Sequence, residues 1–199
     1  MLDEWGTWWD EEPGTIPGHL YQQNTLRDAF VASLSFDIFH KYTDRLKMAN
    51  IAQIVNVLQS MILTKGKDMV LTPTYYVFKM YNVHQDATYL PLDLNCEVMD
   101  VRDNRKVVSA TASKDKDGKI HISMSNIDAD NAQEITINLP DVKAKKAVGE
   151  ILTSANLTEY NSFENPNNIK LAPFKEVKIN KGTMKVKLPA KSIVTLELQ

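Results

Sequence analysis

An acidic pair stands directly before all the tryptophans of the chain. The first nine residues read Met-Leu-Asp-Glu-Trp-Gly-Thr-Trp-Trp; the pair is Asp3 and Glu4, and the tryptophans are Trp5, Trp8 and Trp9. A large aromatic face stacks on the apolar side of a sugar ring, and a carboxylate serves as acid, base or nucleophile on a glycosidic bond. The pattern is therefore typical of a carbohydrate site. The alternative is a segment whose tryptophans only pack against the protein.

Four segments in a fixed order carry a family resemblance. They are Asp-Glu-Trp-Gly-Thr-Trp-Trp at 3–9, Leu-Tyr-Gln-Gln-Asn-Thr-Leu-Arg-Asp-Ala at 20–29, Met-Ala-Asn-Ile-Ala-Gln-Ile-Val-Asn-Val-Leu-Gln at 48–59, and Leu-Thr-Pro-Thr-Tyr-Tyr-Val-Phe at 71–78. Together they closely resemble the C-terminal half of α-L-arabinofuranosidases of glycoside hydrolase family 51. The rest of the chain is compatible with the β-sandwich that follows the barrel in that family, but it carries no motif of its own.

This resemblance implies an α/β plus all-β fold, namely the C-terminal part of a (β/α)8 TIM barrel followed by a jelly-roll-like antiparallel β-sandwich. Residues 1–86 would hold barrel strands 7 and 8 with their helices, and residues 87–199 the sandwich domain. By the same resemblance Glu4 is the catalytic nucleophile, at the end of the seventh strand. The substrate-binding residues would be Gln53 at the end of the eighth strand, Trp8 in the sugar subsite, and Trp5.

The general acid/base is where the sequence departs from the family pattern. In the family it is a glutamate in a Gly-Asn-Glu motif far upstream, and no Asn-Glu pair occurs in this sequence. We therefore expect a fragment of a retaining α-L-arabinofuranosidase that is inactive by itself. Its substrates would be terminal arabinofuranosyl residues of arabinose-containing oligosaccharides or polysaccharides. The complete enzyme would be a homo-oligomer that needs no metal and no organic cofactor.

Two other function classes stay open. One is a different retaining barrel glycosidase that acts on β-linked sugars, although Ala-Gln at 52–53 and Leu-Thr-Pro-Thr-Tyr at 71–75 argue against it. The other is a non-catalytic carbohydrate-binding or assembly module, which fits the sandwich part and the absent acid/base. The two are separated by an activity assay on the chain with and without its upstream sequence.

Composition narrows the classes of partner. A formal net charge of −2 gives no basic footprint for nucleic acid or an anionic membrane surface. No run of eighteen apolar residues occurs, so no transmembrane helix is expected. Cys96 is the single cysteine, which excludes a disulfide within the chain. The acidic, aromatic first residues do not resemble a signal peptide, and localisation is open between cytoplasm and periplasm.

Helices and one strand must position these residues. A helix is expected from Asn24 or Thr25, where Thr25 and Asp28 form a capping-box pattern. Its apolar stripe, which we expect to be buried, recurs every four residues at Leu26, Phe30, Leu34 and Ile38. The resemblance indicates a buried strand from Lys47 to Gln53. A second helix is expected to begin at Thr72-Pro73, because proline fits the first helical position.

From about residue 87 the hydrophobic pattern alternates with period two, which is typical of antiparallel strands with one buried face. The expected strands are 88–94, 96–102, 107–113, 119–125, 133–139, 147–153, 177–180, 183–188 and 192–198. Residues 154–176 are expected to be irregular. Asp-Lys-Asp-Gly at 115–118 resembles part of a calcium loop, but a hairpin turn is the favoured interpretation.

Overall fold

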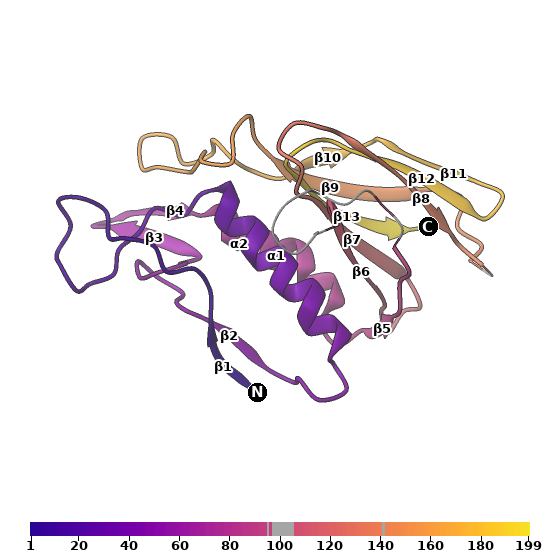
Figure 1. The fold of residues 1–199 in the computed structure, drawn as a ribbon, viewed down its shortest axis with the longest axis horizontal. Helices are drawn as coiled ribbons and strands as arrows, with labels where there is room; N and C mark the ends of the chain where they lie inside the picture. The colour runs from indigo at the N-terminus through magenta and orange to yellow at the C-terminus, as the bar shows by residue number, and fades with distance from the viewer. Residues whose placement is uncertain (95, 97–105, 141) are drawn as a thin grey trace. The chain divides into compact units, whose positions relative to one another are not determined.

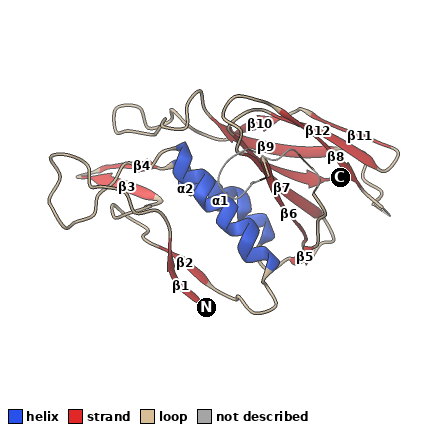
Figure 2. Cartoon of the chain, in the orientation of Figure 1, coloured by secondary structure: helices blue, strands red, loops and turns tan. Residues whose placement is uncertain are grey.

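A computed structural model describes residues 1–94, 96, 106–140 and 142–199 (Figures 1 and 2). The described residues divide into two compact units. The first comprises Met1–Lys79 and Ser154–Lys170, and the second Met80–Thr153 and Leu171–Gln199. Neither α-helix among these residues is long and apolar enough to cross a membrane.

The first unit contains a parallel strand pair with a helix in its connection. The elements are β1 (Leu2–Trp5), α1 (Leu26–Lys41), β2 (Ala49–Ile51), the hairpin strands β3 (Ile62–Lys65) and β4 (Asp68–Leu71), and the start of α2 (Pro73–Tyr81). Parallel strands require a crossover such as this β–α–β connection, because the end of the first strand and the start of the second lie at opposite edges of the sheet. Both expected helices are confirmed. The expected strand is shorter than predicted, so Gln53 follows β2 instead of ending it.

Helix α1 begins as predicted. Thr25 is its N-cap, and the capping box with Asp28 is present. The stripe expected to be buried is only partly so: Leu26 is fully buried, whereas Ile38 is 54% exposed. Toward its C-terminal end the helix instead contacts β1 through Phe36 and Phe39, so the packed face is rotated away from Ile38.

Residues 154–170, part of the stretch expected to be irregular, belong to the first unit. The backbone N–H groups of Leu26 and Arg27 donate to carbonyls of this segment, each at 2.9 Å, which satisfies donors that a helix N-terminus leaves unpaired. The fully buried Asn161 donates to Leu71 O and Ile169 O at 2.8 Å each, and accepts Ile169 N–H at 2.7 Å. Asn161 therefore fastens the segment to β4.

The second unit is built from antiparallel sheets. Its elements are the 3-10 helix η1 (Asn82–His84) and the strands β5 (Thr88–Leu90), β6 (Val108–Lys114), β7 (Ile120–Asn126), β8 (Gln133–Asn138), β9 (Ala147–Thr153), β10 (Ala172–Phe174), β11 (Val177–Asn180), β12 (Thr183–Leu188) and β13 (Ser192–Leu198). The strand order is β10-β9-β13-β7-β6-β5 in the larger sheet and β11-β12-β8 in the smaller. Every strand pair among the described residues of this unit is antiparallel.

Both sheets of the second unit, whose strands are labelled in Figure 1, contribute side chains to one core. Ile122 and Met124 of β7 are buried in it with Met184 and Val186 of β12, at exposures of 2% or less. The expected alternation of buried and exposed residues is confirmed in β8 and β12. It is wrong for β7, where Ser123 and Ser125, on the face expected to meet water, are fully buried as well. The strand expected at 96–102 lies outside the described residues except for Cys96, and β10 forms where no strand was expected.

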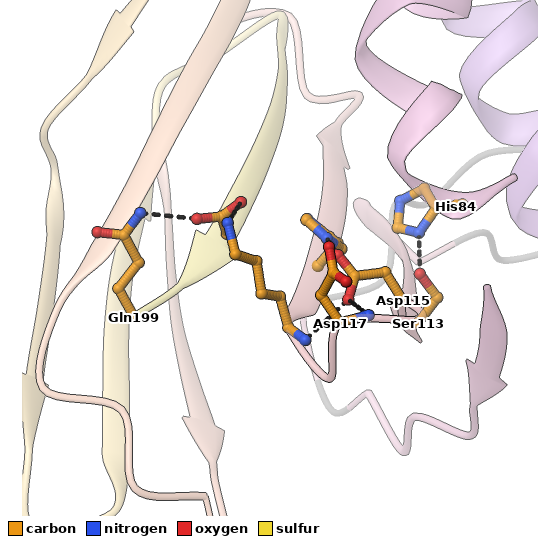
Figure 3. Close-up of polar contacts among 8 residues, drawn as sticks. His84, Ser113, Asp115, Asp117 and Gln199 are labelled. Atoms are coloured by element: carbon orange, nitrogen blue, oxygen red, sulfur yellow. Dashed lines mark hydrogen bonds and ion pairs between the residues drawn. The ribbon is translucent and has the colours of Figure 1, made fainter.

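Asp115 organises the turn between β6 and β7 (Figure 3). Its Oδ1 accepts the backbone N–H groups of Asp117 at 3.0 Å and Lys119 at 2.9 Å, and its Oδ2 lies 2.9 Å from His121 Nε2. The hydrogen bond with His121 is the largest cause that holds the pKa of Asp115 below its usual value. Asp115 thus serves a hairpin turn, as favoured from the sequence. The described residues contain no acidic or histidine cluster that could hold a metal.

Candidate active site

The parallel pairing of β1 and β2 brings the predicted site residues to one edge. Leu2 is paired with Ala49 and Trp5 with Ile51. Just beyond β2, the Ala52 N–H donates a hydrogen bond to Trp5 O at 2.9 Å, so the two segments remain adjacent. Parallel strands end at the same edge of their sheet, where α/β folds place ligands. The segments that follow β1 and β2 therefore begin next to each other at this edge.

A hollow of about 220 Å³ lies at this edge. It is lined by Glu4, Trp5, Gly6, Thr7, Trp8, Ala52 and Leu58. Glu4 is exposed, Trp8 is 67% exposed, and Asp3 does not line the hollow although it is adjacent in sequence. Glu4 is also the one carboxylate among the lining residues. An exposed carboxylate thus shares a hollow with an exposed indole face, which is the combination that a sugar ring needs.

Gln53 is not among the residues that line this hollow. It is exposed and lines a larger cavity of about 780 Å³, together with His19, Tyr21 and Asn56. Asn56 is occupied structurally, because its side chain donates to Thr64 Oγ1 at 2.8 Å and accepts Thr64 N–H at 2.7 Å. Gln53 directly follows Ala52, which lines the first hollow, so consecutive residues of the chain line the two cavities.

The ring of Trp5 lies among other aromatic side chains. The ring of Trp5 packs edge-on against Phe36 and Phe39, at centroid distances of 5.5 and 5.2 Å, and stacks on Phe78 at 6.1 Å. Its indole N–H is buried and has no hydrogen-bond partner in the described part of the chain. Trp5 is thus largely a packing residue on its ring faces, and a role in substrate binding stays a prediction.

A buried set of polar side chains lies beneath residues 6–9, and the sequence alone did not reveal it. Asp28 Oδ1 accepts Thr7 Oγ1–H at 2.8 Å and the Trp9 indole N–H at 2.7 Å. Gln22 accepts the Trp9 backbone N–H at 2.9 Å, and Gln59 accepts the Thr7 N–H at 2.9 Å. Asp28 and Gln59 are fully buried and Gln22 is 2% exposed. The only signal in the sequence is that these residues are polar beside apolar neighbours.

Comparisons with known proteins identify the family of the chain. The family model of the α-L-arabinofuranosidase C-terminal domain matches residues 3–192. The chain is 85% identical to an intracellular exo-α-L-arabinofuranosidase from Bacteroides ovatus, in an alignment over 100% of this chain and 39% of the relative. The GH51 arabinofuranosidase from Xanthomonas axonopodis pv. citri is 47% identical with a TM-score of 0.96, over 99% of this chain and 40% of that one.

A more distant structure has the same fold. The thermostable GH51 α-L-arabinofuranosidase from Thermotoga petrophila RKU-1 is 22% identical with a TM-score of 0.87, over 100% of this chain and 42% of that one. The chain spans about two fifths of the length of the proteins it matches. The resemblance found in the sequence is thereby confirmed: the chain belongs to the α-L-arabinofuranosidase C-terminal domain family and matches the C-terminal region of glycoside hydrolase family 51 arabinofuranosidases.

Proposed function

We propose that this chain supplies the nucleophile and part of the sugar-binding surface of a retaining α-L-arabinofuranosidase. One observation carries the proposal: Glu4 and Trp8 line the same hollow at the edge of the β1–β2 pair. The complete enzyme would remove terminal non-reducing arabinofuranosyl residues from arabinose-containing oligosaccharides and polysaccharides. The 85% identity to an exo-α-L-arabinofuranosidase supports this substrate class.

In the proposed enzyme β1 and β2 are the last two strands of a (β/α)8 barrel. The β1–α1–β2 connection supports this assignment, because it is the repeating unit of such a barrel. The strands of the second unit, without residues 154–170, would form the jelly-roll-like domain that follows. The other barrel strands, and with them the acid/base glutamate, would come from residues outside this chain.

The proposed reaction has two steps. Glu4 attacks the anomeric carbon of the arabinofuranosyl ring and forms a glycosyl-enzyme, while the acid/base glutamate protonates the departing oxygen. The same glutamate then removes a proton from the water that hydrolyses the intermediate. Trp8 offers an indole face to the apolar side of the ring. The ring is thereby held with its anomeric carbon toward Glu4.

A mechanism-based label tests the assignment of the nucleophile. A complete enzyme is obtained by exchanging the matching segment of the Bacteroides ovatus relative for residues 1–199, which is practicable at 85% identity. A 2-fluoro-arabinofuranosyl inhibitor slows hydrolysis of the glycosyl-enzyme, so the label should be found on Glu4 by peptide mass spectrometry. Asp3 is the internal control, since it has the same charge and lies outside the hollow. A label on Asp3 or any other residue would refute the assignment.

Gln53→Ala is expected to lower kcat/KM in the same enzyme by about 2- to 13-fold, because a hydrogen bond to a sugar hydroxyl contributes about 0.5–1.5 kcal/mol. Its melting temperature should stay near that of the unmodified enzyme, since Gln53 is exposed. Gln59→Ala is the contrast: Gln59 is fully buried and hydrogen-bonded, so its loss should lower the melting temperature. Unchanged kinetics with a large loss of stability in Gln53→Ala would make it a structural amide.

A further inference from the structure

In the loop after β1 one tryptophan is largely exposed, and the next one is held by hydrogen bonds to buried side chains. Trp8 is 67% exposed and lines the hollow with Glu4. Trp9 donates its indole N–H to the buried Asp28 carboxylate at 2.7 Å, and the Arg27 guanidinium lies 3.8 Å from the centre of its ring. Thr7, on the other side of Trp8, donates its hydroxyl to the same Asp28 oxygen at 2.8 Å. Trp8 is thus held between two residues that share one acceptor.

Two buried amides complete the support. Gln22 accepts the Trp9 backbone N–H at 2.9 Å and donates to Thr7 Oγ1 at 3.0 Å. Gln59 accepts the Thr7 backbone N–H at 2.9 Å and donates to Asp28 O at 2.7 Å. Every side chain in the set is buried except that of Trp9. Buried hydrogen bonds with satisfied partners fix a single geometry, so the backbone that carries Trp8 has little freedom.

We propose that Asp28 is a positioning residue for Trp8, which acts on the sugar through Trp8 and not by contact. The inference rests on the proposed function, in which Trp8 is the sugar platform. Asp28 reaches the loop from the first turn of α1, where the backbone N–H groups of the helix favour a carboxylate. The rigid helix therefore sets the position of the loop.

A carboxylate suits this position because each polar group that contacts its two oxygens is a hydrogen-bond donor. Oδ1 accepts from Thr7 and Trp9, and Oδ2 accepts the Thr25 N–H at 2.7 Å and lies 3.1 Å from the Thr25 hydroxyl. An asparagine has one acceptor oxygen and an NH₂ group that only donates. In either orientation its NH₂ group faces an N–H donor. Asp28→Asn therefore keeps the shape of the side chain but loses the hydrogen bonds at one of the two oxygen positions.

The test is a double-mutant cycle in the complete enzyme, with Asp28→Asn, Trp8→Ala and the double variant. Misplacement of a substrate contact by a distant change lowers rates by up to about 100-fold, and we expect Asp28→Asn to lower kcat/KM on an aryl arabinofuranoside by about 10-fold or more. In the Trp8→Ala background the same change should lower it by less than about 2-fold, because coupled residues are not additive. Trp9→Phe removes the indole donor to Asp28 and keeps an aromatic ring beside Arg27, so it should follow the same pattern if Asp28→Asn does not fold.

Asn161→Asp is the matched stability control. It removes the donors that fasten residues 154–170 to β4, and Asn161 lines neither cavity. It should lower the melting temperature and leave kcat/KM within about 2-fold. Full additivity of Asp28→Asn and Trp8→Ala, or an equal loss of activity in Asn161→Asp, would overturn the positioning role. Trp8→Ala without any effect on kcat/KM would instead contradict the proposed function.

Discussion

Glu4→Ala in the complete enzyme is expected to lower turnover of an aryl arabinofuranoside by about 10⁴-fold or more, equivalent to more than about 5 kcal/mol of barrier. The physical reason is that the covalent intermediate forms on this carboxylate, so its removal deletes the first step. Sodium azide should restore turnover, because the small anion fits the space that the carboxylate leaves in the hollow beside Trp8. Attack by azide from that side gives an arabinosyl azide of inverted configuration, which nuclear magnetic resonance identifies.

Asp3→Ala is the matched control for this change. Asp3 has the same charge, is adjacent in β1 and is exposed, but it does not line the hollow with Glu4. It should retain most of the activity and should not respond to azide. Substantial turnover by Glu4→Ala without azide would show that another residue is the nucleophile. Loss of activity in Asp3→Ala together with azide rescue would transfer the role to Asp3.

Local signals in the sequence predicted the elements whose causes are local. The Thr25–Asp28 capping box marked the start of α1, Thr72-Pro73 marked the start of α2, and alternation marked most strands of the second unit. The exposure of Ile38 was not predictable from periodicity, because the packed face of α1 is decided by aromatic residues from β1 and α2. Contacts distant in sequence override a local stripe.

The same distinction applies to the site. Glu4 and Trp8 are neighbours in sequence, and one motif was enough to single them out. The sequence indicates Asp28 only as a helix cap, because its contacts with Thr7 and Trp9 span about twenty residues and leave no pattern in the sequence. Likewise Asn161 contacts Leu71 across 90 positions. Buried polar side chains of this kind are chosen by partners that only the folded chain brings together.

The hollow that holds Glu4 contains one carboxylate, and this bears on what the chain can do by itself. A retaining glycosidase needs two carboxyl groups about 5–5.5 Å apart, one to attack and one to move protons. Of the residues that line the hollow, only Glu4 is acidic. Without the second group both glycosylation and hydrolysis lose general acid/base assistance, and each such loss lowers a rate by about 10²- to 10⁴-fold.

Residues 1–199 by themselves are therefore expected to show no measurable turnover of an aryl arabinofuranoside, while the enzyme completed with the upstream part of the Bacteroides ovatus relative turns it over. The comparison uses equal concentrations, and circular dichroism establishes that the shorter chain is folded, so that inactivity is not a consequence of unfolding. The completed enzyme carrying Glu4→Ala serves as the inactive reference. If the folded 199 residues hydrolyse the substrate at a rate within about tenfold of the completed enzyme, these residues contain their own acid/base, and the assignment of that role to an upstream glutamate is wrong.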